Sequence, residues 1–232
     1  MKKKILLIAG HGEGDPGAVS KWGQEADLAR DLLKRIPKYL NVSVLNAELY
    51  DTAKDCYQQT KKGTGPDYGA YDFILEIHFN AKQKKDEEGD GSFTGTGGYV
   101  QKGADTEIAQ AMIQELVALG FQKWCLCTTE ELCNCNAAWR AKTPYFLLET
   151  AFLDDGDDMR FYSRHKEKIA KAIAEVLNEK VGGERQQDHP ERGDHIYRVQ
   201  CGAFLRRENA EAFKKQLEEA GFPTVIVVAK SQ

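Results

Sequence analysis

Short apolar runs alternate with longer amphipathic segments along most of this 232-residue chain. Three apolar runs have the length of strands, at residues 5–9, 73–78 and 146–149, and a shorter strand is predicted at residues 42–45. Three longer segments carry apolar side chains at helical spacing, at residues 24–40, 106–119 and 159–180. Strands that alternate with helices are typical of an α/β domain, so the pattern predicts a mostly parallel, twisted sheet flanked by helices.

Polar residues follow the predicted strands at the point where each strand ends. His11 comes just after the first run, His78 ends the second and Glu149 ends the third, while Glu25 lies in the first turn of the helix that follows His11. In an open α/β sheet, ligands bind outside the carboxyl ends of the strands. Two imidazoles and one carboxylate, with water, form the ligand set of several hydrolytic zinc enzymes, and a second carboxylate can act as general base.

Charge and hydropathy exclude several classes of protein. The net charge is −4 and no basic stripe is present, so we expect no nucleic-acid partner. No run approaches the roughly 20 apolar residues of a membrane span. The apolar run at residues 5–9 is shorter than the roughly 7–15 residues of a secretory core, so we expect synthesis in the cytoplasm without a signal peptide.

Four of the six cysteines gather between residues 125 and 135, in the sequence Cys-Leu-Cys-Thr-Thr-Glu-Glu-Leu-Cys-Asn-Cys. The chain is neither short nor visibly secreted, which favours reduced thiols in a loop or a hairpin. A structural metal is the alternative, although zinc ribbons and fingers usually place two to four residues between paired cysteines. We expect no metal there.

A polar segment at residues 181–194 has almost no apolar side chains and reads as a linker between two domains, at residues 1–180 and 195–232. The second domain shows a strand, a helix and a strand, at residues 196–204, 209–220 and 224–229. One such βαβ unit is too small to bury a stable core alone.

Five short motifs occur in order along the first domain: Gly10-His11-Gly12, Asp15-Pro16-Gly17-Ala18, Gly23-Gln24-Glu25-Ala26, Glu76-Ile77-His78-Phe79-Asn80-Ala81 and Leu148-Glu149-Thr150-Ala151-Phe152-Leu153. With them, residues 4–179 resemble the zinc-dependent N-acetylmuramoyl-L-alanine amidases of the amidase-3 type. The resemblance implies hydrolysis of the amide between N-acetylmuramic acid and L-alanine in peptidoglycan. It also implies His11, Glu25 and His78 as ligands of one Zn²⁺ per active site, with Glu149 as the catalytic carboxylate.

Other polar residues near the predicted site have weaker claims. Glu13 and Asp15 are possible substitute ligands, but both lie in a turn and better suit loop shaping. Asn80 is expected either to orient substrate or to cap a helix. Three further histidines are not expected to be ligands, because one lies on a charged helical stretch and two lie in or beside the linker: His165, His189 and His195.

The tail resembles the first half of a sporulation-related (SPOR-like) repeat, a peptidoglycan-binding module, through residues 197–204, 208–210 and 217–222. A single βαβ half leaves apolar surface uncovered, so we expect a homodimer formed through residues 195–232. The protein would act at the cell wall after release, as a phage lysin or an autolysin freed by lysis. Two alternative functions stay open: a non-catalytic wall-binding module, and a zinc peptidase acting on stem peptides.

Overall fold

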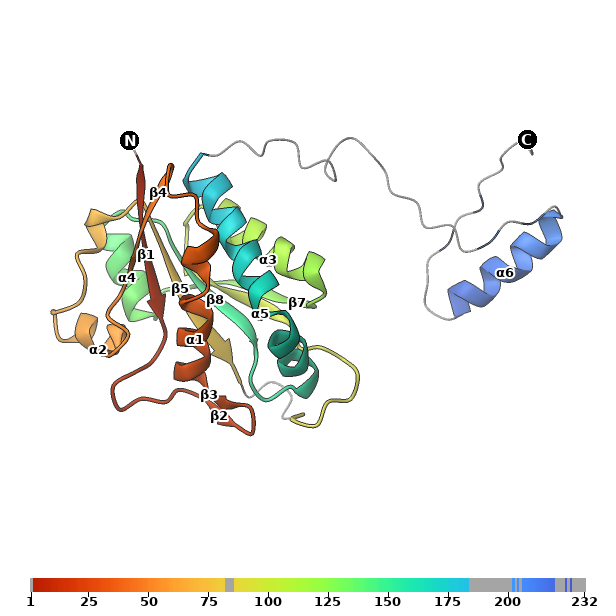
Figure 1. Cartoon of the computed structure of the whole chain (residues 1–232), viewed down its shortest axis with the longest axis horizontal. Coiled ribbons are helices and arrows are strands. Elements are labelled where there is room, and N and C mark those ends of the chain that lie inside the picture. Colours follow the sequence, from red (N-terminus) through yellow and green to blue (C-terminus); the bar gives the residue numbers. More distant parts are fainter. Residues whose placement is uncertain are drawn as a thin grey trace. The chain divides into compact units, whose positions relative to one another are not determined.

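The computed structural model describes residues 2–81, 86–183, 202, 204, 206–219, 224 and 226. The chain divides into two compact units, Met1–Gln186 and Gln187–Gln232 (Figure 1). Within the residues described here, no helix is both long and apolar enough to cross a membrane.

The first unit is built on a six-stranded sheet with the strand order β4-β1-β5-β8-β6-β7. Its strands are β1 (Lys3–Ala9), β4 (Leu45–Leu49), β5 (Phe73–Asn80), β6 (Thr96–Gln101), β7 (Lys123–Thr129) and β8 (Tyr145–Phe152). All neighbouring strands are parallel except β6 and β8. The predicted class, a mostly parallel sheet flanked by helices, is confirmed. A short hairpin of β2 (Val19–Ser20) and β3 (Gly23–Gln24) follows β1.

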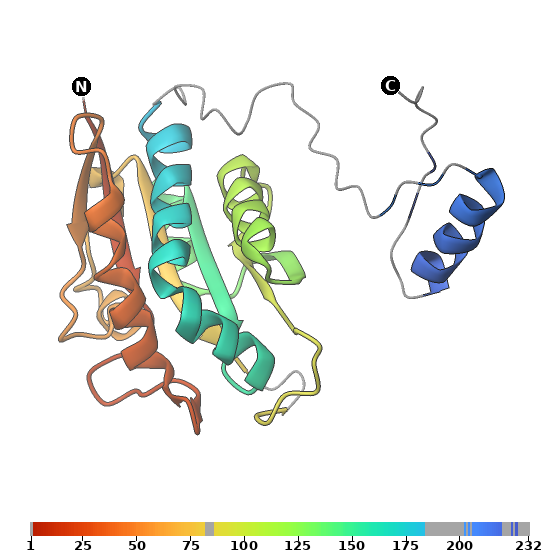
Figure 2. The same cartoon turned by 45° about the vertical axis from the view of Figure 1, so that its right-hand side comes forward.

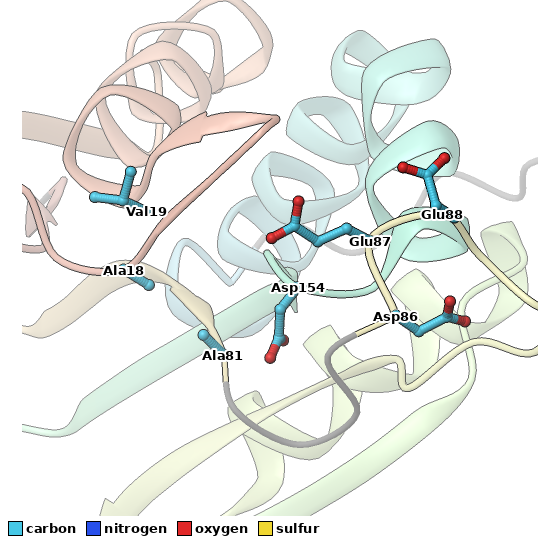
Figure 3. Close-up of a pocket in the computed structure, with 7 residues that line it drawn as sticks. All are labelled: Ala18, Val19, Ala81, Asp86, Glu87, Glu88 and Asp154. Atoms are coloured by element: carbon cyan, nitrogen blue, oxygen red, sulfur yellow. The ribbon is translucent and has the colours of Figure 1, made fainter.

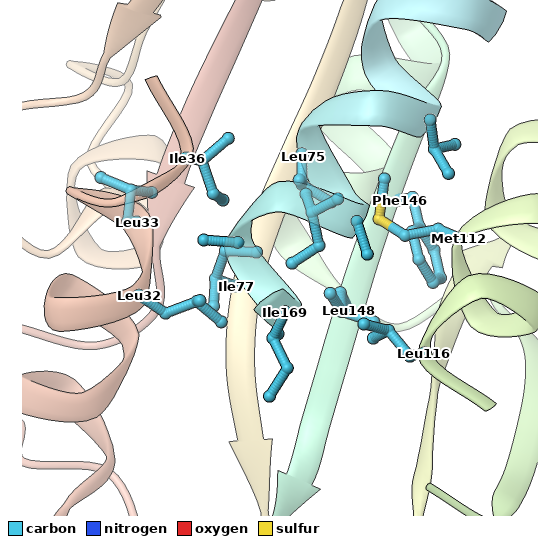
Figure 4. Close-up of a cluster of buried hydrophobic side chains, with 14 of the residues drawn as sticks. Leu32, Leu33, Ile36, Leu75, Ile77, Met112, Leu116, Phe146, Leu148 and Ile169 are labelled. Carbon is cyan, nitrogen blue, oxygen red and sulfur yellow. The ribbon is translucent and has the colours of Figure 1, made fainter. Parts of the chain in front are cut away.

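Three helices cover one face of the sheet, as Figures 1 and 2 show: α1 (Glu25–Leu33), α3 (Glu107–Leu119) and α5 (Gly156–Val176). Figure 4 shows aliphatic side chains from these helices meeting those of β5 and β8. Leu75 and Leu148 are fully buried there, against Leu32, Leu116 and Ile169. Burial of this apolar surface is the main favourable term in folding.

The opposite face carries two shorter helices, α2 (Cys56–Lys61) and α4 (Cys133–Arg140), and the 3₁₀ turn η2 (Tyr68–Ala70). Its core is smaller and includes tyrosines and cysteines, among them Tyr68, Tyr145 and Cys135. Polar atoms are therefore buried on this side of the sheet, and each requires a partner.

Two predicted elements differ from the structure near the first helix. The predicted helix over residues 24–40 is divided into α1 and a 3₁₀ turn, η1 (Ile36–Tyr39). Pro37 lies in the first turn of η1, and a proline disfavours α-helix at the residue before it. The strand predicted at residues 42–45 is β4, which begins at Leu45 instead.

The cysteine-rich segment forms regular structure, so the predicted loop or hairpin is wrong. Cys125 and Cys127 lie on β7, while Cys133 and Cys135 lie on α4. β7 is an edge strand whose residues are mostly half-buried, which explains why its apolar pattern was weak in the sequence.

The prediction of four reduced thiols is also wrong for one pair, since Cys125 and Cys127 form a disulfide. Residues i and i+2 of a strand point to the same face, and the two Cα atoms lie 5.7 Å apart, within the usual range for a disulfide. Cys56, Cys133 and Cys135 are free thiols. Among the described residues, no cysteine belongs to a group that could hold a metal ion.

In the second unit, the predicted helix over residues 209–220 is α6 (Arg207–Glu219). Phe213 on this helix packs against Phe204, with ring centroids 5.5 Å apart. Most residues of the two predicted strands, His189, His195 and most of the predicted linker lie outside the described residues. The predicted boundaries of the domains stay a prediction; the η3 turn (Leu177–Val181) of the first unit reaches into the predicted linker.

Candidate metal centre and active site

Four elements bring the predicted site residues together at the carboxyl end of the sheet. His78 on β5 and Glu149 on β8 are paired in register across adjacent parallel strands. Gly10 donates its backbone N–H to Ile77 O (2.9 Å), which holds the residue before His11 against β5. Glu25 is the first residue of α1, where the helix dipole favours a carboxylate.

Glu25 lies between the two histidines. Its Oε1 is 3.1 Å from His11 Nε2 and 2.9 Å from His78 Nδ1. One potential ligand atom from each of the three residues lies within 4.8 Å of the others. Backbone N–H groups of Ala18 and Phe79 donate to the same carboxylate and fix its position. Two nitrogens and one oxygen that converge in this way fit Zn²⁺.

The other nitrogen of each imidazole faces a carboxylate. His11 Nδ1 is 2.9 Å from Asp15 Oδ2, and His78 Nε2 is 2.9 Å from Glu76 Oε1. Metal-binding histidines usually use their second nitrogen in this way, which orients the ring. The other oxygen of Asp15, Oδ1, accepts the backbone N–H of Gly17 (2.9 Å), a contact within its own loop. Glu76 was not singled out from the sequence; its position two residues before His78, hence on the same face of the strand, was the available signal.

Beside the imidazole rings of His78 and His11, close packing leaves room for no residue larger than glycine. A Cβ at Gly10 would lie 2.3 Å from His78 Cε1, and a Cβ at Gly17 would lie 2.6 Å from His11 Cδ2. His11 itself has φ of 60°, in the left-handed region that non-glycine residues rarely adopt. The Arg30 guanidinium donates to the carbonyl oxygens of Gly10 and His11 and so stabilises this conformation.

Glu149 differs from the other carboxylates of the site because it has few partners. Its Oε2 is buried and has no hydrogen-bond partner among the residues that the structure describes. Burial raises the pKa of Glu149 to about 7; the neighbouring imidazole of His78 opposes this rise, and the charge of Glu25 adds to it. A carboxyl group with a pKa near 7 suits transfer of a proton in either direction at neutral pH.

Glu25 behaves in the opposite way. Burial alone would raise its pKa, but hydrogen bonds with His11 and His78 hold the pKa of Glu25 well below its usual range. Burial likewise opposes the charge on His78, yet Glu25 and Glu76 raise the pKa of His78 well above its ordinary value. Two carboxylates in one site thus have pKa values pushed apart, which separates a charged ligand from a group that moves protons.

Comparisons with known proteins identify the family of this chain. Residues 5–179 match the amidase-3 family, N-acetylmuramoyl-L-alanine amidase. The chain belongs to this family. Residues 166–232 match the SPOR domain, in agreement with the resemblance of the tail.

Two relatives and one solved structure show the extent of the similarity. The probable autolysin PH of Staphylococcus aureus is 32% identical over 203 residues, which cover 78% of this chain and 40% of that protein. The N-acetylmuramoyl-L-alanine amidase CwlM of Bacillus licheniformis is 26% identical over an alignment of 240 positions, which covers 98% of this chain and 86% of CwlM. The catalytic domain of CwlV from Bacillus (Paenibacillus) polymyxa is 21% identical with a TM-score of 0.62, covering 77% of this chain and 98% of that domain, and shows the same fold.

Two pockets open beside the candidate site of this amidase domain. The smaller, of about 260 Å³, is lined by the four predicted site residues and also by Phe79, Asn80, Ala81, Tyr99, Leu132 and Leu147. The larger, of about 500 Å³, shares Ala81 with it. Figure 3 shows the larger pocket, whose lining includes the carboxyl groups of Asp86, Glu87, Glu88 and Asp154.

The lower-ranked residues are not among the possible metal-binding groups of the described part of the chain. Glu13 is exposed and belongs to no group that could hold a metal among the residues described. Asn80 lines the smaller pocket, and its Oδ1 accepts the N–H of Ala81 rather than capping a helix. His165 is half-buried on α5, where its ring packs against Phe161 with centroids 4.2 Å apart, and it belongs to no possible metal-binding group among the described residues.

Proposed function

We propose that this chain is a zinc-dependent amidase that hydrolyses the bond between N-acetylmuramic acid and L-alanine in peptidoglycan. Family membership supports the peptidoglycan amidase activity. The convergence of His11 Nε2, Glu25 Oε1 and His78 Nδ1 beside a buried carboxyl group is the observation that carries the proposed chemistry. One Zn²⁺ per active site would occupy this position.

Each residue has a defined part in this proposal. Bound zinc would lower the pKa of a water ligand to about 7 and polarise the scissile carbonyl. His11, Glu25 and His78 would hold the ion, and the carboxylate of Glu25 would partly neutralise its charge. Glu149 accepts the proton of the attacking water and returns it to the amine that leaves, a role worth roughly 10²–10⁴-fold in rate.

Digestion of purified peptidoglycan tests this reaction directly. We expect new free amines on L-alanine, without new reducing sugars. Chelation should abolish the reaction and added zinc should restore it. New amines elsewhere in the stem peptide would favour the zinc peptidase, and an absence of new termini, together with retention on the wall, would favour the non-catalytic module.

We also propose that the SPOR-like unit attaches the enzyme to glycan strands, because residues 166–232 match that domain. The predicted homodimer through residues 195–232 depends on apolar side chains of which most lie outside the described residues; on α6, no described residue is buried. Light scattering tests the dimer: full-length protein should have twice the mass of its chain, and a version ending near Val181 should be monomeric. Action at the cell wall after release likewise stays a proposal.

A further inference from the structure

Glu76 is a buried carboxylate at the centre of the sheet. It lies on β5 two residues before His78, so both side chains point to the same face. Only 4% of its surface is exposed. An ionised carboxylate at this depth is costly unless its oxygens are paired, so its partners indicate its role.

Both oxygens of Glu76 have partners. Oε1 lies 2.9 Å from His78 Nε2, on the side of the ring away from Glu25. Oε2 accepts hydrogen bonds from Tyr145 OH (2.6 Å) and Asn134 Nδ2 (2.9 Å). Two neutral donors therefore anchor one oxygen, and the other is directed to the histidine.

The anchor extends to the helices that cover this face. Asn134 Oδ1 on α4 accepts from Tyr68 OH (3.0 Å) on η2, and Tyr68 OH lies 2.6 Å from Thr60 Oγ1 on α2. This chain of hydrogen bonds fixes the orientation of Asn134, and through it that of Glu76. A fully paired buried network of this kind is rigid.

We propose that Glu76 is a positioning residue for the metal site. By accepting a hydrogen bond from His78 Nε2–H, it keeps the lone pair of Nδ1 toward the site, and its negative charge makes the imidazole a stronger ligand. This inference rests on the proposed zinc site. Asp15 has the equivalent place on His11, but its side chain is 43% exposed against 5% for Glu76, so water screens its charge.

Zinc affinity tests the proposal without relying on activity. Competition with a chromophoric chelator would be measured for the natural protein, for Glu76→Gln and for the matched variant Asp15→Asn. Loss of such a partner typically weakens metal binding by about 10–100-fold. We expect a loss in this range for Glu76→Gln and a smaller one for Asp15→Asn.

A second variant separates positioning from stability. In Glu76→Gln the new amide faces Asn134 Nδ2, so two donors oppose each other. Adding Asn134→Asp supplies an acceptor for that amide and retains the acceptor for Tyr68 OH, while the negative charge moves away from His78. We expect the double variant to regain the unfolding temperature of the natural protein in chelator, but to keep the weakened zinc affinity. At saturating zinc, KM for peptidoglycan should be unchanged.

Three results would overturn the inference: zinc affinity equal to that of the natural protein in a folded Glu76→Gln variant, recovery of affinity in the double variant, or loss of the fold in both, which would assign Glu76 to folding alone. A natural protein that binds no zinc would instead refute the proposed function. The two failures are therefore distinguishable.

Discussion

Along β1, β5 and β8, successive side chains point to opposite faces of one sheet, and the two faces differ in composition. The face under α1, α3 and α5 carries a row of apolar side chains at alternate positions, with Ile5, Leu7, Ala9, Phe73, Leu75, Ile77, Phe79, Phe146 and Leu148. The face under α2 and α4 begins with apolar residues and becomes polar towards the carboxyl ends, with Leu6, Ile8, Ile74, Glu76, His78, Tyr145, Leu147 and Glu149.

This difference shows how one sheet serves both stability and chemistry. The apolar face buries surface against three long helices, and that burial tolerates no charge. The polar face holds carboxyl groups and imidazoles in fixed positions through paired hydrogen bonds, at little gain in stability. Substitutions on the first face should therefore change folding, and those on the second should change metal binding and catalysis.

The largest expected effect belongs to Glu149 on the polar face. Glu149→Gln removes the proposed general base and should lower the rate of peptidoglycan hydrolysis by roughly 10²–10⁴-fold. Because Glu149 is not a proposed ligand, zinc content should be unchanged. Rate and metal analysis of the same preparation check this, with the exposed Glu131→Gln as control. A near-normal rate would remove Glu149 from the reaction, and loss of zinc would make it a ligand.

Leu75, which precedes Glu76 on β5, tests the apolar face. Leu75→Ala should reduce the free energy of unfolding by about 2–5 kcal/mol, because the side chain is fully buried among aliphatic neighbours. The folded variant should bind zinc with an affinity within about twofold of that of the natural protein. A tenfold loss would mean that Leu75 and the metal site are coupled by about 1.4 kcal/mol. Urea unfolding and chelator competition measure the two quantities. A large loss of affinity in Leu75→Ala would break the division between the faces.

Gly10 tests how closely the backbone of β1 approaches the site. A methyl group in Gly10→Ala would overlap the ring of His78 and displace it. We expect zinc affinity to fall at least about tenfold, as for other losses of ligand orientation. Gly69→Ala is the control, because its Cβ would lie 3.5 Å from the nearest atom. Equal affinities in the two variants would show that the ring adapts without cost.

The pH dependence of kcat reports on the same carboxyl group. A general base must be ionised, so kcat should rise with pH until Glu149 is deprotonated, about tenfold per unit below its pKa. Burial places that pKa at about 7, and a nearby metal cation would lower it. The acid limb should therefore lie at or below pH 7. A kcat that decreases as the pH is raised from 5 to 7 would contradict the assignment of Glu149 as general base.

The smallest effect is expected for the disulfide on the edge strand. Cys125 and Cys127 are two residues apart, so their bond closes a very short loop and restricts the unfolded chain little. Replacing both by Ser should change the free energy of unfolding by about 1–2 kcal/mol and leave turnover of peptidoglycan unchanged. Unfolding in urea with and without dithiol reductant checks this. A large loss of activity would link β7 to the site.

Much of the fold could be predicted because its signals are local. The apolar runs of β1, β5 and β8 and the helical spacing of α3 and α5 identified the sheet and its flanking helices. The boundary after α1 depended on Pro37, and β7 and α4 were missed because a half-buried edge strand and a short helix have weak periodicity. The disulfide was not predicted, because reduced thiols were expected for a chain that is not visibly secreted. The position of Cys125 and Cys127 on one face of a strand was not evident from the sequence.

The sequence by itself determined the class of the fold and the residue types of the site, because His11, Glu25, His78 and Glu149 follow local patterns at strand and helix ends. Only the tertiary structure decided which nitrogen of each histidine faces Glu25 and which carboxylate stands behind it. Those positions depend on strand register and on contacts between residues far apart in the chain, such as Glu76 with Asn134 and Tyr145. Local patterns carry no information about such contacts, because packing and hydrogen bonding between distant segments establish them.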